Sequence, residues 1–147
     1  MRIGILGGTF DPPHIGHLVI GDQARAQLGL DRVWFTPVGQ PPHKSNTSPA
    51  ADRVAMTRLA IDDYEAFEVC LVDVERPPPH YTVHLFEELR RRWPEHEFWF
   101  IIGADALIDM PRWQQPRWRP GRTESMSRTG SRSPGSGRLP VRGRVQR

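Results

Sequence analysis

A strand that ends in paired glycines and leads into a helix is the feature that most constrains the fold of this chain. Residues 3–6, IGIL, form an unbroken apolar run, which is typical of a strand buried on both faces of a parallel sheet. Gly7 and Gly8 follow this run. From Ile15 onward the apolar residues take a helical period that stops before Gly29. The first unit is therefore predicted to be a strand, a glycine turn and a helix.

The same alternation of strand and helix continues to residue 103. Ser48 is expected to cap the second helix with Pro49 in its first turn, and Thr82 to cap a third helix that Pro94 closes. Between the helices we predict strands at 33–38, 67–75 and 97–103. Such alternation favours right-handed crossovers, so we expect an α/β Rossmann-like fold, a parallel sheet with helices on both faces.

Each predicted helix has an apolar face that we expect to pack on the sheet. The faces are Ile15, Leu18, Val19 and Leu28 in the first helix, Val54, Met56, Leu59 and Ile61 in the second, and Leu85, Phe86 and Leu89 in the third. These faces would provide most of the helical contribution to the core.

The basic character of the chain comes entirely from its carboxyl-terminal part. Residues 1–115 hold 11 Lys and Arg against 16 Asp and Glu, whereas residues 116–147 hold nine Arg against Glu124 alone. The second segment is rich in Arg, Gly, Ser and Pro and has no apolar period. We therefore predict an α/β domain over 1–115 and a tail over 116–147 that is disordered in isolation.

Several classes of protein are excluded by what the sequence lacks. It has no apolar run long enough to cross a membrane, and MRIGILGG leads at once into a polar turn, unlike a signal peptide. The lone Cys70 excludes a disulfide framework and a cysteine metal cluster, and it is expected to be a buried thiol. We expect a cytoplasmic protein, and the sequence leaves an oligomer possible.

The segment GGTFDPPHIGH at 7–17 has the composition of an anion site. Glycines at the end of a strand allow close approach to a phosphate, and the helix that follows directs its backbone N–H groups at the same place. His14 and His17 are neighbours on one helical face, and Gly16 leaves room between them for a ring or a ribose. Two imidazole donors beside a phosphate favour displacement at phosphorus, where charge on non-bridging oxygens must be stabilised.

The same eleven residues, with HIGH at their end, resemble the signature of the nucleotidylyltransferase superfamily and in particular the bacterial nicotinate-nucleotide adenylyltransferases. Further stretches are similar to that family's pattern in the same order: PPHKS at 41–45, RVAMTRLAI at 53–61, HYTVHLFEEL at 80–89 and FIIGADAL at 100–107, followed by Trp113. The resemblance covers residues 1 to about 115.

This resemblance implies transfer of AMP from ATP to nicotinate mononucleotide with Mg²⁺, which belongs to NAD biosynthesis. It implies that His14, His17 and Lys44 act on the ATP phosphates, and no residue is assigned as a metal ligand. The implied ATP-binding residues are Gly7, Gly8, Thr9, Phe10, Gly16, Gly103 and Asp105, and the implied residues for the second nucleotide are Thr82 and Trp113.

One element of the family's pattern is missing. The family carries a second phosphate motif, S-x-T-x-x-R, after a further strand and helix. Ser127, Thr129 and Arg132 fit its spacing, but a tail of this composition produces such a match by chance. We therefore expect the carboxyl-terminal strand and helix of the domain to be missing here, through truncation or a frame shift.

Three alternatives stay open at this point. The first is a sister nucleotidylyltransferase, such as a phosphopantetheine adenylyltransferase, and the second is a truncated, non-catalytic nucleotide binder. The third is a nucleic-acid module driven by the basic tail. It is the weakest, because no aromatic interleaving or recognition fold accompanies the arginines. We expect no specific nucleic-acid partner.

Overall fold

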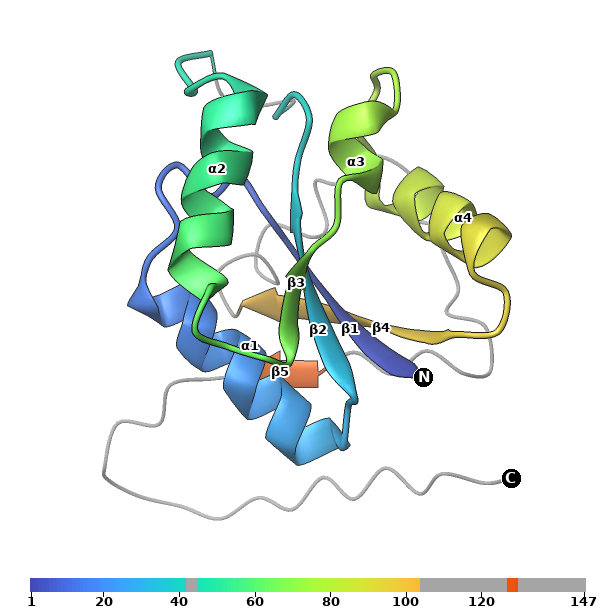
Figure 1. The fold of residues 1–147 in the computed structure, drawn as a ribbon. Helices are drawn as coiled ribbons and strands as arrows, with labels where there is room; N and C mark the ends of the chain where they lie inside the picture. The colour runs from blue at the N-terminus through green and yellow to red at the C-terminus, as the bar shows by residue number, and fades with distance from the viewer. Residues whose placement is uncertain (42–44, 104–126, 130–147) are drawn as a thin grey trace.

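The computed structural model describes residues 1–41, 45–103 and 127–129. Its elements are β1 (Arg2–Gly8), α1 (Ile15–Leu28), β2 (Arg32–Pro37), α2 (Ala50–Ile61), β3 (Phe67–Val69), α3 (Val72–Glu75), α4 (Thr82–Arg92), β4 (Glu97–Gly103) and β5 (Ser127–Thr129). The strands are parallel and lie in the order β3-β2-β1-β4-β5. Figure 1 shows α1 and α2 on one side of this sheet and α3 and α4 on the other. The predicted Rossmann-like architecture is confirmed.

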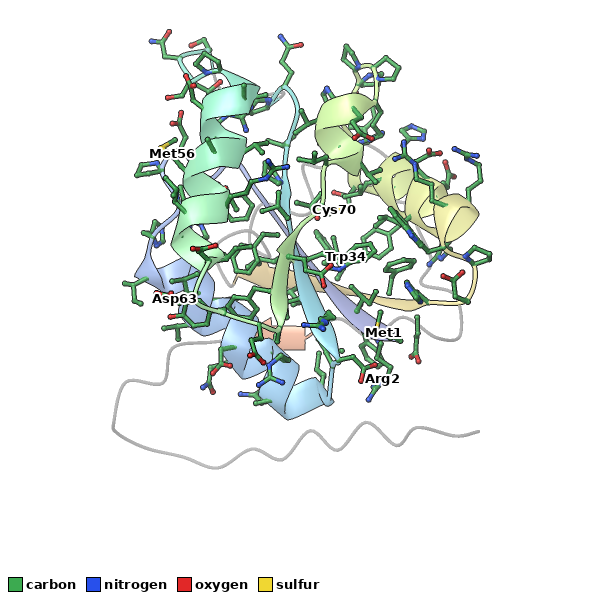
Figure 2. All side chains as sticks on the ribbon, viewed as in Figure 1. Met1, Arg2, Trp34, Met56, Asp63 and Cys70 are labelled. Atoms are coloured by element: carbon green, nitrogen blue, oxygen red, sulfur yellow. The ribbon has the colours of Figure 1, made fainter. Side chains whose placement is uncertain are left out.

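The sheet buries apolar side chains on both faces because successive strand residues point to opposite sides. In β1, Ile3 and Ile5 pack with α3 and α4, while Leu6 packs with α1 and α2. Trp34 and Cys70 belong to the core on the α3 and α4 side of the sheet. Both residues are labelled in Figure 2. Burial on both faces explains why the strand sequences are largely unbroken runs of apolar residues.

Helix α1 buries Gly21 and Ala24, and Leu18 and Leu28 of the predicted apolar face pack beside them on the core, but Ile15 and Val19 do not belong to the buried face. Ile15 is 69% exposed and Val19 is 52% exposed, whereas Gly21 is buried. A Cβ on Gly21 would lie 3.3 Å from the Phe35 ring and 3.4 Å from the Phe67 ring. The two rings can reach the helix backbone only because this side chain is absent, and Ile15 and Val19 lie on the solvent side of the helix.

Helix α2 also differs from its predicted face and cap. Leu59 is 79% exposed, and the buried residues are Arg53, Thr57 and Ile61. Pro49, not Ser48, is the N-cap residue. The Ser48 N–H donates to Asp11 Oδ2 at 2.7 Å, which ties the start of α2 to the turn after β1.

The strand predicted at 67–75 ends at Val69, and residues 72–75 form α3 instead. Val33 N–H donates to Ala66 O, and Cys70 N–H donates to Phe35 O, so alternate residues of β2 face β3. The next β2 residue on that side is Pro37, which has no N–H to donate. The ladder therefore stops, and the chain turns into α3.

Two differences concern the start of α4 and the edge of the sheet. Thr82 is the first helical residue and Tyr81 is the N-cap residue, so Thr82 does not cap the helix as predicted. Ser127–Thr129, which the sequence analysis left without regular structure, pair with β4 as β5. An edge strand offers unpaired N–H and C=O groups to any extended segment, whatever its side chains. The remaining tail residues and the predicted domain boundary at 115/116 lie outside the described part of the chain.

The strand order places a switch point between β1 and β4. The chain moves from β1 outward to β2 and β3, then returns to the other side of β1 as β4. At such a point the loops after neighbouring strands leave in opposite directions and open a crevice at the carboxyl ends, where open α/β sheets bind ligands. Among the described helices, none has the length and apolar character needed to span a membrane.

Candidate functional site

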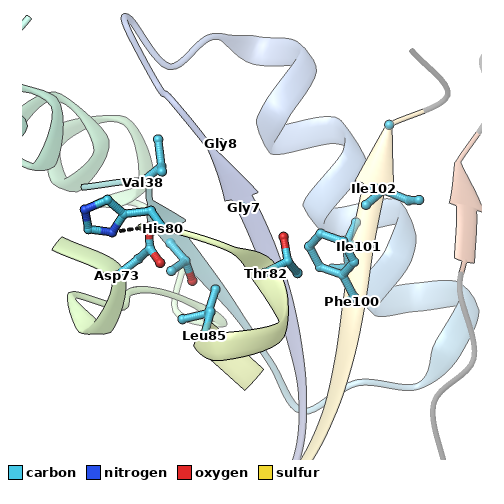
Figure 3. A pocket seen from close by; sticks show the side chains of 12 residues that line it. Gly7, Gly8, Val38, Asp73, His80, Thr82, Leu85, Phe100, Ile101 and Ile102 are labelled. Carbon is cyan, nitrogen blue, oxygen red and sulfur yellow. Dashed lines mark ion pairs between the residues drawn. The ribbon is translucent and has the colours of Figure 1, made fainter. Parts of the chain in front are cut away.

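A cavity of about 200 Å³ opens at the switch point (Figure 3). Its walls are the carboxyl ends of β1, β2 and β4, the first turn of α4, Asp73 of α3 and His80 of the segment between α3 and α4. The lining residues are Gly7, Gly8, Thr36, Val38, Asp73, His80, Thr82, Leu85, Phe100, Ile101, Ile102 and Gly103. The wall is largely apolar with a few polar groups, as is usual for small-molecule sites.

The structure brings together some of the predicted site residues. Gly7, Gly8, Thr82 and Gly103 line the cavity. The other described candidates lie in the adjoining turn and the first turn of α1, outside the cavity lining: Thr9, Phe10, His14, Gly16 and His17. Three predicted residues lie outside the described part of the chain: Lys44, Asp105 and Trp113.

The turn between β1 and α1 is held by a buried aromatic ring. Phe10 has a backbone φ of 51°, a left-handed conformation that a bulky residue rarely adopts. Its side chain is 2% exposed and packs on Phe35 at 5.7 Å and against the edge of His17 at 4.9 Å, measured between ring centroids. Such conformations cost about 1–3 kcal/mol and persist where surrounding contacts enforce them, often at functional sites.

His14 and His17 form one unit at the start of α1. Their rings stack with centroids 3.8 Å apart and planes inclined by 28°. The His14 N–H donates to His17 Nδ1 at 3.1 Å, so a neutral His17 carries its proton on Nε2. A Cβ on Gly16 would lie 3.0 Å from the His14 ring, so that ring borders the space predicted beside this glycine.

The first turn of α1 is suited to an anion. It contains no acidic side chain, and the first backbone N–H groups of a helix point outward along its axis. The positive end of the helix dipole acts in the same direction. The turn after β1 therefore combines backbone donors, a helix amino terminus and two imidazoles.

The sequence analysis missed several groups in the cavity. Thr36 and Val38 could have been found, because they stand at the carboxyl end of a predicted strand. Asp73 could not, because the pattern predicted it to be inside a strand. His80 opens the stretch HYTVHLFEEL but was not predicted to be a site residue. Its side chain is only 4% exposed, and its Nδ1 lies 3.4 Å from Asp73 Oδ2.

Most of the chain matches a known family. Residues 5–127 match the family described as cytidylyltransferase-like. A probable nicotinate-nucleotide adenylyltransferase of Exiguobacterium sibiricum is 50% identical over 116 residues, which are 78% of this chain and 61% of that protein. A protein of the same description from Synechococcus is 47% identical over 116 residues, 78% of this chain and 56% of the relative. The chain thus spans about three fifths of the length of these curated relatives.

Solved structures show the same fold. A nicotinic acid mononucleotide adenylyltransferase of Plasmodium falciparum, in complex with NaAD, superimposes with a TM-score of 0.68 at 17% identity, covering 90% of this chain and 77% of that one. A putative nicotinate-nucleotide adenylyltransferase of Vibrio parahaemolyticus superimposes with a TM-score of 0.64 at 21% identity, covering 86% and 73%. At these identities the likeness concerns the fold alone.

Proposed function

The chain belongs to the cytidylyltransferase-like family, and we propose that it transfers the adenylyl group of MgATP to nicotinate mononucleotide, giving nicotinate adenine dinucleotide and pyrophosphate. The observation that carries the proposal is the stacked pair His14 and His17 at the amino end of α1, next to the cavity at the strand switch point. The names of the curated relatives support this choice of substrates.

The reaction requires positioning more than covalent catalysis. The 5′-phosphate oxygen of the mononucleotide attacks the α-phosphorus of ATP in line, and the bond from the α-phosphorus to the bridging oxygen breaks. Pyrophosphate leaves with that electron pair. The attacking phosphate is already ionised at neutral pH, so no general base is needed. Charge that develops on the phosphate oxygens must be met by fixed donors.

The roles of the residues follow from this chemistry. His14 and His17 donate to the ATP phosphates, and Lys44 reaches a phosphate from the segment after β2. Thr82 and Trp113 contact the mononucleotide, with Trp113 near the pyridine ring. The nucleotide lies against the remaining candidates, largely through their backbone: Gly7, Gly8, Thr9, Phe10, Gly16, Gly103 and Asp105.

Mg²⁺ enters as part of the substrate. In the part of the chain that the structure describes, no group of three or more His, Cys, Asp or Glu side chains could hold a metal ion. Mg²⁺ commonly keeps several waters and is bound largely through substrate phosphates. A cytoplasmic location and an oligomeric state stay predictions.

The test is adenylyl transfer by the full chain. MgATP is supplied with nicotinate mononucleotide, nicotinamide mononucleotide or phosphopantetheine, and both pyrophosphate and the adenylylated product are measured. We expect transfer to the pyridine mononucleotides, faster to the acid, and none to phosphopantetheine. Turnover of phosphopantetheine would instead identify the sister enzyme. Binding of a non-hydrolysable ATP analogue by calorimetry without any pyrophosphate release would identify a non-catalytic binder.

A further inference from the structure

A buried guanidinium lies beneath the turn that follows β1. Arg53 of α2 is 1% exposed. Within the described part of the chain, its guanidinium donates hydrogen bonds to backbone carbonyls only. Arg53 Nη1 donates to Thr9 O at 3.0 Å and to Val38 O at 2.7 Å, Nη2 donates to Gly39 O at 2.8 Å, and Nε donates to Ser48 O at 2.9 Å. One side chain therefore ties together the turn after β1, the segment after β2 and the segment before α2.

A buried carboxylate lies on the other side of the segment after β2. Asp73 is 4% exposed and accepts from Gly39 N–H at 3.1 Å and from Arg76 Nε at 2.9 Å. Arg76 Nη2 also contacts Asp73 and donates to Tyr81 O at 3.1 Å. Through Arg76, Asp73 is connected to the residue that precedes Thr82 and the cavity wall of α4.

Arg53 and Asp73 hold the same peptide unit. In a trans peptide the C=O of one residue and the N–H of the next point in opposite directions. Arg53 takes the carbonyl of Val38, and Asp73 takes the N–H of Gly39. A cation at the oxygen and an anion at the N–H polarise this peptide in the same sense, so each hydrogen bond strengthens the other.

We propose that Arg53 and Asp73 are positioning residues that act through the Val38–Gly39 peptide to fix the turn after β1 relative to the amino end of α4. This inference rests on the proposed function, in which the two nucleotides bind on these two walls. The reacting phosphates meet in line only if the walls keep their spacing. A misplacement of about 1 Å can cost roughly a hundredfold in rate.

The linkage is tested without any ligand by amide hydrogen exchange on the full chain. The Val38 N–H donates to Gly8 O at 2.9 Å and so reports on the turn after β1, while the Gly39 N–H reports on Asp73. We expect Asp73→Asn to speed exchange at Val38, and Arg53→Lys to speed exchange at Gly39, each by about tenfold, because charge-assisted hydrogen bonds are lost. The double variant should exchange no faster than the faster single variant.

Matched controls are Glu68→Gln, which removes an exposed carboxylate that pairs with Arg32, and Arg58→Lys, an exposed arginine of the same helix. Neither should change exchange at the two amides. Effects of Asp73→Asn confined to Gly39, or additive effects in the double variant, would overturn the linkage. If Asp73→Asn does not fold, Arg76→Lys, which loosens Asp73 from its other side, takes its place.

A kinetic measurement separates positioning from simple structural support. Well below the unfolding temperature, we expect Arg53→Lys to lower kcat for adenylyl transfer about tenfold or more while KM for ATP changes less. The reason is that misaligned phosphates destabilise the transition state more than the bound substrates. An unchanged kcat with accelerated exchange would overturn the positioning role. If the wild-type chain transfers no adenylyl group, the proposed function fails, and the exchange data still decide whether the two residues are linked.

Discussion

The His80 ring lies directly on Gly39: a Cβ placed on this glycine would be 2.4 Å from His80 Cε1 and 2.8 Å from Asp73 O. The His80 side chain is buried, so the ring cannot simply swing into solvent. We expect Gly39→Ala to displace His80 and to lower the free energy of unfolding by about 1–3 kcal/mol, as other overpacked positions do. Urea denaturation measures this loss.

The double variant Gly39→Ala with His80→Ala identifies the obstacle. If the new methyl group collides with the His80 ring, removing the ring should restore part of the unfolding free energy that Gly39→Ala loses. The effects of the two substitutions on stability would then not be additive. A double variant that loses the sum of both single effects would show that the backbone oxygen of Asp73, and not the ring, resists the methyl group.

His17 has two functions that substitutions can separate. His17→Asn places an amide oxygen near the position of Nδ1, so it can still accept from the His14 N–H, but it lacks the Nε2 donor. We expect kcat for adenylyl transfer to fall about a hundredfold, as when an oxyanion donor is lost. The midpoint of thermal unfolding should stay close to that of the wild type.

His17→Ala is the comparison for this variant. It removes both functions, so it should lose a similar factor in kcat and in addition about 1 kcal/mol of stability, the usual cost of losing a helix cap. It should lower kcat more than it raises KM for ATP. Steady-state kinetics with an unchanged kcat in both variants would argue against a transition-state role.

Gly4 and Gly7 lie in the same strand but should respond differently to alanine. A Cβ on Gly4 would be 2.6 Å from Ile101 Cδ1 and 2.7 Å from Leu30 Cδ1, both in the core, so Gly4→Ala should cost about 1–3 kcal/mol of stability. A Cβ on Gly7 would meet nothing closer than Phe100 Cε2 at 3.8 Å. Gly7→Ala should therefore fold normally but weaken binding of an ATP analogue in calorimetry, since Gly7 lines the cavity. Equal stability losses in the two variants would contradict this division.

The order of strands and helices could be predicted because the apolar period changes from strand to helix at each turn. The buried face of α4 was predicted correctly, because Leu85, Phe86 and Leu89 are all buried, but the faces of α1 and α2 were predicted only in part. Gly21 has little apolar surface, so hydrophobicity alone favoured Ile15 and Val19. The end of β3 also depends on the sheet, because the missing donor belongs to Pro37 on the neighbouring strand.

The candidate site was predictable where one short segment carries it. Gly7, Gly8 and the two histidines lie in a single strand-to-helix turn, so local sequence was sufficient. Arg53 was missed because an arginine on a helix is ordinarily exposed, and Asp73 was missed because the apolar pattern predicted a strand at its position. Only the three-dimensional arrangement brings the carbonyls of two other segments to Arg53.

The ion pairs at the end of α4 should contribute to folding stability in a way that depends on pH and salt. Hydrogen bonds from Arg91 and Arg92 lower the pKa of Glu88 to about 2. The ionised form of Glu88 is therefore favoured more in the folded chain than in the unfolded one. Its contribution to folding stability is complete above about pH 4.5 and is lost as the pH falls toward 2. The stability difference between wild type and Glu88→Gln should shrink over that range, and also in 1 M salt (a Debye length of about 3 Å), because Arg91 is exposed and Glu88 is only partly buried. A difference that is constant with pH would contradict the pairing.

The Cys70 thiol should be inert in the folded protein. Burial raises its pKa above the ordinary value of 9.0, because the thiolate would lose its hydration between β3 and α3. The thiol of the unfolded chain ionises first as the pH rises, so the contribution of Cys70 to stability is intact below pH 9 and decreases above it. We expect a disulfide reagent at pH 8 to modify Cys70 slowly in the native chain and rapidly in urea, and Cys70→Ser to remove its part of the alkaline loss of stability. Rapid modification of the native chain, at a rate unaffected by urea, would show that the thiol is accessible and that the core around Cys70 opens readily.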